Sequence, residues 1–449
     1  MFPIRLGTDA QFTALRDALH TCGEAALQNP AAARLFIDGA TIDRSAASHL
    51  PLPELEALGV ITALADRIVA NVMLYQARGL LIVSDRTQPK ENDPSPPPED
   101  VVFPANISNT GLFLDHIPPG KGDAFLDLCA GTGIAALAAA QSGATHAWAF
   151  DITARSTHFA EFNRRLNGIS NVTPAQGDLY EPAGNQTFDR IVAHPPYLPV
   201  YRPRFVFDSG GQDGEQVVRR IVEGLPKYLR PGGKFYALTM GSDREQPFEH
   251  RLREWLGDAA PEFDIAFVVR KTVPPRQYSA DAVVAHKGAA ADISGWRALF
   301  EKWGVQSLVY GFVVIQRRLI DRPVFTVRRD AGPNTGPEQL AWLVEWETRA
   351  LDAHKLLSAK PRASQNASLQ VEHRFVDGAW QPESYCLSSE YPFIAGMRTE
   401  PWAAHVLTLA NGSLTVAELL EQLPVNANPL EFARAVAAMI SAGFLVLDR

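Results

Sequence analysis

The sequence predicts an α/β protein centred on a doubly wound, mostly parallel sheet, with an N-terminal helical and hairpin domain and a C-terminal α+β domain. Between residues 101 and 240, short apolar runs rich in β-branched residues alternate with helical patterns, which is typical of parallel strands joined by crossover helices. Residues 88–100 contain five prolines and no large apolar side chain, which indicates an exposed linker. At roughly 150 residues per domain, a chain of 449 residues predicts more than one domain.

Residues 1–87 are expected to form the N-terminal domain, for which we predict a recognition role. Apolar side chains recur at helical spacing over 8–30, and 52–59 predicts a short helix that stops at a glycine. The apolar runs 68–75 and 79–84 predict a pair of strands.

Residues 101–330 are expected to form the central domain. The expected elements are strands at 124–128, 147–151, 172–175, 188–193 and 234–238, and helices at 134–142, 154–167 and 213–229. Further apolar runs at 263–269 and 309–315 are candidates to complete the sheet, with a helix at 291–303 between them.

Residues 331–449 are expected to form a C-terminal accessory domain. A helix over 337–357 precedes two strand-like runs joined by Asp377-Gly378, which is a strong hairpin signal. Three short helices and a terminal strand over 400–449 resemble a winged helix. That segment contains two arginines and no lysine, so we expect it to dock protein rather than to read DNA.

Composition and charge exclude several classes of protein. Hydrophobic residues make up 46% and charged residues 20% of the chain, which is typical of packed globular proteins. The net charge of −8 provides no global positive field toward nucleic acid or anionic lipid. The three cysteines are far apart, and no ligand cluster indicates a metal site. Without an apolar run suited to export or membrane insertion, we expect a cytoplasmic protein with no membrane partner.

A glycine motif follows the first strand of the central domain, with the pattern Asp127-x-Cys129-x-Gly131-x-Gly133. Glycines at this turn let the main chain approach a ligand closely. The spacing also fits a loose dinucleotide pattern, with Asp151 as the later acidic residue, so NAD is one candidate ligand. However, Asp127 would repel a pyrophosphate and attract a cation. The motif therefore favours a zwitterionic sulfonium ligand over NAD.

Two more carboxylates follow the next two strands. Asp151 ends the second strand, where its two oxygens can accept hydrogen bonds from both hydroxyls of a ribose; an N-cap of the next helix is the alternative interpretation. Asp178 follows the third strand and can offer its carboxylate to an exocyclic adenine amine, although its Gly-Asp motif alone is a common turn. Carboxylates at three successive strand ends together predict a single ligand that contacts all three along its length.

The tetrapeptide His194-Pro195-Pro196-Tyr197 follows the fourth strand. With the glycine motif and the two later carboxylates, it makes the chain resemble the class I S-adenosylmethionine-dependent methyltransferases, which have a Rossmann-like fold. The tetrapeptide is similar to the Asn-Pro-Pro-Tyr signature of the methyltransferase small domain group. That group includes HemK-like protein-glutamine methyltransferases and enzymes that methylate base amines in RNA or DNA. The resemblance is good over about 100–240.

The resemblance implies S-adenosylmethionine as the cofactor. The implied cofactor-binding residues are Asp127, Gly131 and Gly133 at the methionine end, Asp151 at the ribose and Asp178 at the adenine, with Cys129, Ile152 and Leu179 beside them. In the family tetrapeptide, the Asn side chain and the next carbonyl accept hydrogen bonds from a planar NH₂ group while the aromatic ring stacks on it. The implied catalytic residues here are His194, Pro195, Pro196 and Tyr197.

His194 stands where the family has Asn. A neutral His can accept a hydrogen bond, and it can also take up a proton near neutral pH. Either His194 and the carbonyl of Pro195 hold a planar nitrogen, or His194 deprotonates another acceptor, such as a hydroxyl or a small-molecule amine. A catalytically dead loop is a third hypothesis, which the retained Pro195, Pro196 and Tyr197 disfavour.

We therefore expect a methyltransferase that N-methylates a planar nitrogen on a macromolecule, most like the protein-glutamine type. The alternatives are an RNA methyltransferase acting on an adenine or guanine amine, a tailoring N- or O-methyltransferase of a peptide or small molecule, and a non-catalytic scaffold with a cofactor fold. After the tetrapeptide, aromatic and cationic side chains interleave, as in an acceptor channel or a solvated loop; these are Tyr201, Arg202, Arg204 and Phe207.

Overall fold

The computed structural model describes residues 2–23, 25–87, 97–199, 206, 210–285, 292–424 and 427–447. Most of the predicted linker, 88–96, lies outside the described residues. The chain forms two compact units. The first comprises Met1–Ala260, Val273–Leu308 and Arg317–Leu319, and the second comprises Pro261–Thr272, Val309–Gln316 and Ile320–Arg449.

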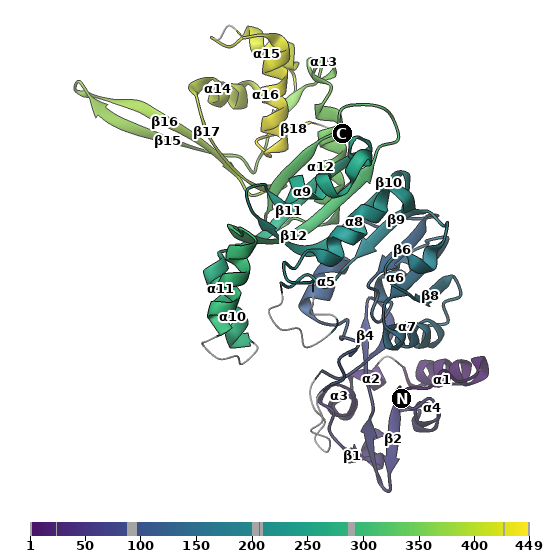
Figure 1. The fold of residues 1–449 in the computed structure, drawn as a ribbon. Helices are drawn as coiled ribbons and strands as arrows, with labels where there is room; N and C mark the ends of the chain where they lie inside the picture. Colours follow the sequence, from purple (N-terminus) through teal and green to yellow (C-terminus); the bar gives the residue numbers. More distant parts are fainter. Residues whose placement is uncertain are drawn as a thin grey trace. The chain divides into compact units, whose positions relative to one another are not determined.

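The first unit contains a parallel sheet with the strand order β10-β9-β6-β7-β8 (Figure 1). Its strands are β6 Ala124–Leu128, β7 His146–Asp151, β8 Val172–Gln176, β9 Phe188–Ala193 and β10 Leu229–Asp243, and its connecting helices include α6 Ile134–Gln141, α7 Ala154–Leu166 and α8 Gln216–Tyr228. From β6 the chain winds to β8 on one side, and β9 and β10 lie on the other. Doubly wound sheets bind ligands where the order reverses in this way, here between β6 and β9. The predicted α/β fold is confirmed.

Helix α7 illustrates why these residues fold as predicted. Its N-cap is Thr153, whose Oγ1 accepts a hydrogen bond from the Ser156 N–H at 3.0 Å, which satisfies one of the free amides at the helix start. Phe159, Phe162 and Leu166 recur at helical spacing and are buried.

The N-terminal part of the first unit consists of short helices and strands. They are α1 Asp9–Cys22, α2 Ala25–Gln28, α3 Pro30–Ala33, η1 Arg34–Asp38, β1 Ile42–Asp43, η2 Arg44–Ala47, α4 Leu52–Ala57, β2 Ile61–Leu64, β3 Arg67–Ala70, β4 Met73–Ala77 and β5 Leu80–Ser84. The single strand predicted over 68–75 is wrong, because β3 pairs with β1 and β2 whereas β4 pairs with β5. Asn71 lies at the break, where its Nδ2 donates to the Gly59 oxygen at 2.9 Å and to Thr62 Oγ1 at 2.8 Å.

This N-terminal part is tied closely to α7. The ring of Phe12 packs edge-on against Phe162, with centroids 5.0 Å apart. Asn163, fully buried, accepts from the Val83 N–H at 2.8 Å and donates to the Val83 carbonyl at 3.0 Å. Asn167 makes the same pair of bonds with Leu81, at 2.9 and 2.7 Å. Residues 1–87 therefore share a compact unit with the central sheet, and their status as a separate recognition domain stays a prediction.

The remaining elements of the first unit include a pair of helices, one of them unpredicted. These elements are α5 Ser108–Asp115, η3 Glu181–Ala183, α9 Phe248–Trp255, α10 Pro275–Ala285 and α11 Asp292–Lys302. The sequence predicts α11 but not α10. The two helices share an aromatic cluster in which Tyr278 meets Trp296 and Phe300 edge-on at 5.5 and 5.8 Å.

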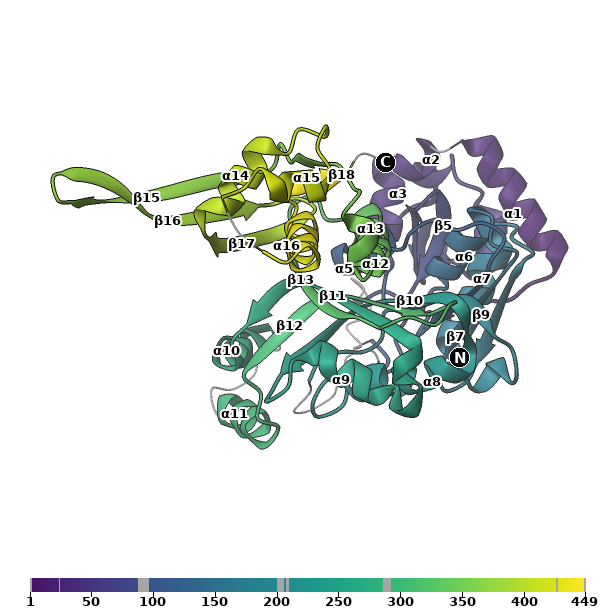
Figure 2. The same ribbon diagram turned by 90° about the horizontal axis from the view of Figure 1, so that it is seen from above.

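The second unit contains a mixed sheet with the strand order β15-β16-β17-β13-β11-β12. Its strands are β11 Phe263–Val273, β12 Ser307–Arg317, β13 Thr326–Ala331, β15 Ser368–Val376, β16 Ala379–Ser389 and β17 Phe393–Thr399. Asp377 and Gly378 have φ values of 50° and 82°, as the turn of a tight hairpin requires, so the predicted hairpin is confirmed. Figure 2 shows β15 and β16 projecting from the rest of this unit.

The helices of the second unit form a cluster next to a small two-stranded sheet. They are α12 Pro337–Ala350, α13 Ala353–Leu356, α14 Pro401–Leu409, α15 Val416–Glu421 and α16 Pro429–Ser441, with β14 Pro361–Ala363 paired to β18 Leu445–Leu447. The last three helices and the terminal strand match the predictions, but the single helix predicted over 337–357 is wrong, because the chain there forms α12 and α13 with a break after Ala350. Strand β14 was not predicted, and the resemblance to a winged helix stays a prediction. Across the described residues, no helix combines the length and hydropathy needed to cross a bilayer.

Candidate active site

A cavity of about 530 Å³ lies in the first unit at the carboxyl ends of the parallel strands. Its volume is within the roughly 300–1,000 Å³ typical of small-molecule sites. The predicted site residues that line it are Asp127, Cys129, Gly131, Asp151, Ile152, Asp178, Leu179, His194, Pro195, Pro196 and Tyr197. The sheet topology therefore brings together side chains spread over some 70 residues of sequence.

Gly133 is the predicted site residue that does not line the cavity. It precedes α6 with a φ of 77°, and a Cβ built on it would lie 3.0 Å from the Cβ of Ala160. The glycine therefore allows α6 to approach α7 closely. Gly131, with a φ of 53°, faces open space: among the described residues, no atom lies within 4 Å of where its Cβ would be.

Asp151 is held by the glycine loop and by the start of α7. Its Oδ2 accepts from the Gly131 N–H at 2.9 Å, and its Oδ1 accepts from the N–H and hydroxyl of Thr153 at 3.0 and 3.1 Å. The N-cap interpretation of Asp151 is wrong, because Thr153 caps α7. The neighbouring Ile152 is 53% exposed and presents apolar surface to the cavity. The pair offers a fixed carboxylate beside an apolar face.

Asp127 is a buried carboxyl at the end of β6. Its side chain accepts from the Ala136 N–H at 3.3 Å. Burial raises the pKa of this carboxyl to about 8, and the nearby negative charge of Asp151 adds to the rise. Cys129 lies beside it with a φ of 59°, and burial raises the pKa of its thiol well above the usual value. Both groups are mostly protonated at neutral pH unless a cation binds next to them.

Asp178 pairs with a cation that the sequence analysis missed. Its Oδ2 lies 2.8 Å from Nη2 of Arg220 on α8, and both side chains are about half exposed. The two residues are far apart in sequence, and no local motif connects them. Leu179, next to Asp178, has a φ of 52°.

Two aromatic rings stack against His194. The Phe113 and Tyr197 centroids lie 5.2 and 5.7 Å from the imidazole, at interplanar angles of 25° and 28°. Its Nε2 is buried and has no hydrogen-bond partner among the described residues. Burial lowers the pKa of His194 to about 4, so the ring is neutral at physiological pH.

Helix α5 contributes a second wall to the tetrapeptide. Asn109 Nδ2 donates to the Tyr197 hydroxyl at 3.3 Å, and Phe113 lies one turn further along the same face. Asn109, Thr110 and Phe113 all line the cavity. The sequence analysis did not identify Phe113, although its spacing of four residues from Asn109 places both on one face of α5.

Some predicted features lie beyond what the structure describes. Tyr201, Arg202, Arg204 and Phe207 lie outside the described residues. Within the described part of the chain, no group of three His, Cys, Asp or Glu side chains is arranged to hold a metal ion.

Comparison with known sequences assigns the cavity to a family. The model of the methyltransferase small domain matches residues 105–262. A putative protein N5-glutamine methyltransferase of Methanocaldococcus jannaschii is 31% identical over 149 residues, which cover 32% of this chain and 74% of that protein. The chain belongs to the methyltransferase small domain family. Its matched segment is a methyltransferase domain with S-adenosylmethionine as the cofactor.

Further relatives and solved structures are similar to portions of the chain. The ribosomal protein uL3 glutamine methyltransferase of Bradyrhizobium diazoefficiens is 37% identical over 136 residues, covering 27% of this chain and 42% of that protein. The release factor glutamine methyltransferase of Geobacter sulfurreducens is 37% identical over 124 residues, covering 24% and 43%. The chain thus spans less than half the length of these two relatives. A ribosomal protein L11 methylase structure from Lactobacillus delbrueckii has 20% identity, covers 44% of this chain and 71% of its own, and has a TM-score of 0.27.

The cavity of this methyltransferase small domain fits S-adenosylmethionine better than it fits NAD. Its described acidic lining residues are Asp100, Asp127, Asp151 and Asp178, and Arg220 is the one lining Lys or Arg among the described residues. A pyrophosphate would meet an excess of negative charge there, whereas a sulfonium and an ammonium group would be stabilised. The open space above Gly131 provides room for the ligand next to the fixed carboxylate of Asp151.

Proposed function

We propose that this chain is a methyltransferase that transfers the methyl group of S-adenosylmethionine to the side-chain amide nitrogen of a glutamine in a protein. The observation that carries the proposal is the state of His194: this cavity-lining residue has a buried, neutral imidazole, and its Nε2 has no hydrogen-bond partner among the described residues. Such a nitrogen can accept one N–H of a planar carboxamide, as the family's Asn does. Its glutamine-methyltransferase relatives support the same acceptor.

The low pKa of His194 disfavours the alternative in which it deprotonates a hydroxyl. A pKa of about 4 makes the ring about 300-fold less basic than an ordinary histidine, whose pKa is about 6.5. A general base works best when its pKa lies near the working pH. His194 is therefore suited to holding an N–H rather than to removing a proton.

Positioning is the main contribution of the protein to this reaction. When bound, S-adenosylmethionine supplies a methyl group that its sulfonium already activates. The two prolines of the tetrapeptide restrict its backbone, and the Phe113 and Tyr197 rings stack against the imidazole. Fixing two reactants in this way can lower the barrier by about 7–11 kcal/mol.

The cavity disfavours RNA as the substrate. Carboxylates outnumber the single described arginine in its lining, and a phosphate backbone needs cations along its path. Supporting a protein acceptor, the segment 400–449 has two arginines and no lysine. We further propose that this segment is a winged-helix-like protein-docking module, that residues 1–87 contribute to recognition, and that the enzyme works in the cytoplasm.

Methyl transfer from tritiated S-adenosylmethionine tests the proposal. The purified chain is incubated with fractionated lysate, ribosomal proteins and a release factor, and aliquots are then treated with protease or RNase. We expect label that protease releases and RNase does not, and mass spectrometry should place one methyl group on a glutamine. Label that RNase releases, or that stays in the small-molecule fraction, would contradict the proposal.

A variant of the tetrapeptide tests the role of His194. His194→Asn keeps a hydrogen-bond acceptor but removes any base, so we expect turnover within about tenfold of the wild type and an unchanged pH profile. Loss of activity that recovers only at high pH would show that His194 acts as a base and would favour a different acceptor.

A further inference from the structure

We propose that Glu215 is a positioning residue for methyl transfer, which acts by fixing residues 210–215 beneath the tetrapeptide loop. The activity part of this inference rests on the proposed function. The structural part can be measured without a methyl acceptor, so that the two can fail separately.

Residues 210–215 lie directly against the main chain that follows the tetrapeptide. The Gly210 N–H donates to the Leu198 carbonyl at 3.1 Å. A Cβ on Gly214, whose φ is 78°, would lie 2.8 Å from the Tyr197 oxygen and 2.7 Å from the Pro199 nitrogen. With no room between them, a shift of one segment must displace the other.

Glu215 anchors this segment through a buried ionic network. Its side chain is fully buried, and its Oε1 accepts from both the N–H and the hydroxyl of Ser242 at 2.7 Å. Arg251 Nη2 lies 2.5 Å from both carboxylate oxygens, and Arg244 Nη2 lies 3.1 Å from Oε2. Arg244 also contacts Asp213 at 3.3 Å. The carboxylate thus fixes residues 213–215 to β10 and α9 with charge-assisted bonds.

The network does not face the ligand. Glu215, Arg244 and Arg251 are absent from the cavity lining, so their charges are not used to bind cofactor or acceptor. For stability alone, apolar side chains of similar volume often serve as well as a buried ionic network. The bonds instead define the position of a loop whose neighbour carries Tyr197.

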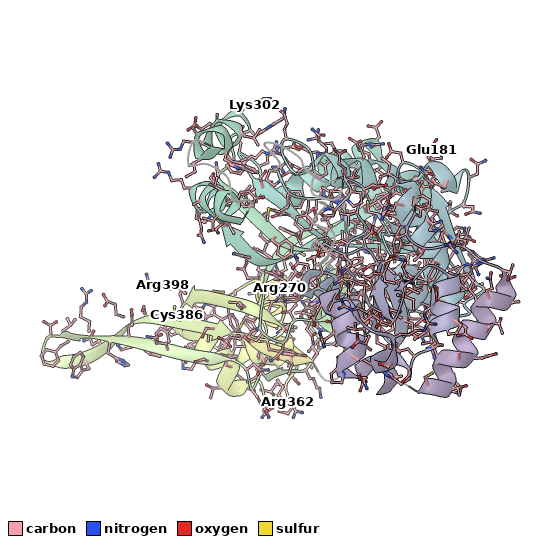
Figure 3. All side chains as sticks on the ribbon, turned by 90° about the horizontal axis from the view of Figure 1, so that it is seen from below. Glu181, Arg270, Lys302, Arg362, Cys386 and Arg398 are labelled. Carbon is pink, nitrogen blue, oxygen red and sulfur yellow. The ribbon has the colours of Figure 1, made fainter. Side chains whose placement is uncertain are left out.

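Contacts at the end of α11 also hold the same segment. Lys302 Nζ, labelled in Figure 3 near the end of α11, donates to Gln212 Oε1 at 3.2 Å. The guanidinium of Arg244 lies over the Trp303 ring, 5.2 Å from its centroid. Segment 210–215 is therefore held both by the Glu215 network and by residues at the C-terminal end of α11.

Two variants with matched controls test the inference. Glu215→Gln removes the charge of the anchor, and Asp264→Asn is its control, because Asp264 is also buried and pairs with Arg322 but does not line the cavity. In Gly214→Ala, the added methyl group would clash with the main chain of residues 197–199 and displace the tetrapeptide loop. Gly122→Ala is its control, because Gly122 has a similar φ of 72° and, among the described residues, no atom within 4 Å of a Cβ.

The first readout is the pKa of His194, measured by a pH titration that is monitored by NMR of its ring. A displaced tetrapeptide loop would expose the imidazole to water, so its pKa should rise from about 4 toward about 6.5 in Glu215→Gln and Gly214→Ala. The pKa should stay near 4 in the two controls. If Glu215→Gln does not fold, the comparison of Gly214→Ala with Gly122→Ala decides.

The second readout is kinetic. With the protein acceptor found by the tritium assay, kcat should fall about 100-fold in the two test variants, as a displacement of about 1 Å can cause. The dissociation constant for S-adenosylmethionine should change by no more than about twofold, because the network avoids the cavity. The inference is overturned if the His194 pKa moves no more than in the controls, or if cofactor affinity falls in parallel with kcat.

Discussion

Binding of S-adenosylmethionine should release a proton from Asp127, so that cofactor affinity rises with pH. The carboxyl of Asp127 has a pKa of about 8, raised mainly by burial. At 1.36 kcal/mol per pKa unit, ionising it costs about 1.4 kcal/mol at pH 7 and about 2.7 kcal/mol at pH 6. A cationic ligand favours the ionised carboxylate, and its binding free energy is reduced by this cost. The dissociation constant should therefore fall about 50-fold between pH 6 and pH 8 and level off above pH 8.

Isothermal titration in buffers of different ionisation enthalpy measures the released proton directly. With a pKa of about 8, close to one proton per cofactor should be released at pH 7. Asp127→Asn is neutral at every pH, so its affinity should lose this slope while the titrations of the ligand and of other residues remain. If the wild type releases no proton, or if both proteins show the same slope, Asp127 is not the group that senses the cofactor's charge.

Three further predictions concern stability and turnover. The folded-state pKa of His194, about 4, lies below its unfolded value of about 6.5, so its contribution to stability is present above pH 6.5 and is lost as the pH falls toward 4. In urea titrations at pH 7 and 4.5, His194→Asn should therefore lose about 2.4 kcal/mol less than the wild type. Asn163→Ala removes the hydrogen bonds of its side chain to the Val83 N–H and to two carbonyls, so it should lower the free energy of unfolding in urea by about 3 kcal/mol. The control Asn171→Ala removes one hydrogen bond and should lower it by about 1 kcal/mol; equal losses would refute this account. Tyr197→Ala should lower kcat about 100-fold while cofactor affinity stays nearly unchanged. Tyr197→Phe loses only the hydroxyl that Asn109 contacts, so its kcat should stay within about tenfold of the wild type. An equal loss of kcat and cofactor affinity in Tyr197→Ala would argue that Tyr197 does not bind the acceptor.

The sequence predicts the cavity well where each site residue directly follows a strand. Asp127, Asp151 and His194 lie at the ends or just after the ends of strands that the apolar pattern identifies, and parallel topology then brings those ends together. Residues that reach the site from other elements carry no such signal. Arg220 meets Asp178 only because α8 passes nearby.

The same reason explains the other differences between sequence and structure. The sequence predicts a helix over 213–229 but gives no role to Glu215, because only the folded chain places Arg251 and Ser242 around its carboxylate. The predicted strand over 68–75 is interrupted because Asn71 bonds to Gly59 and Thr62, which is a tertiary effect. Element boundaries and long-range partners therefore required the structure.

The two asparagines of α7 allow a helix to take the place of a neighbouring strand. Asn163 and Asn167, one turn apart, satisfy amides and carbonyls of β5 as a paired strand would, and Asn163 also donates to the Thr132 carbonyl within the glycine loop. The shape of the glycine loop thus depends on residues 81–83. A shortened enzyme beginning after the proline-rich segment would lose that support, and we expect its glycine loop to become more mobile.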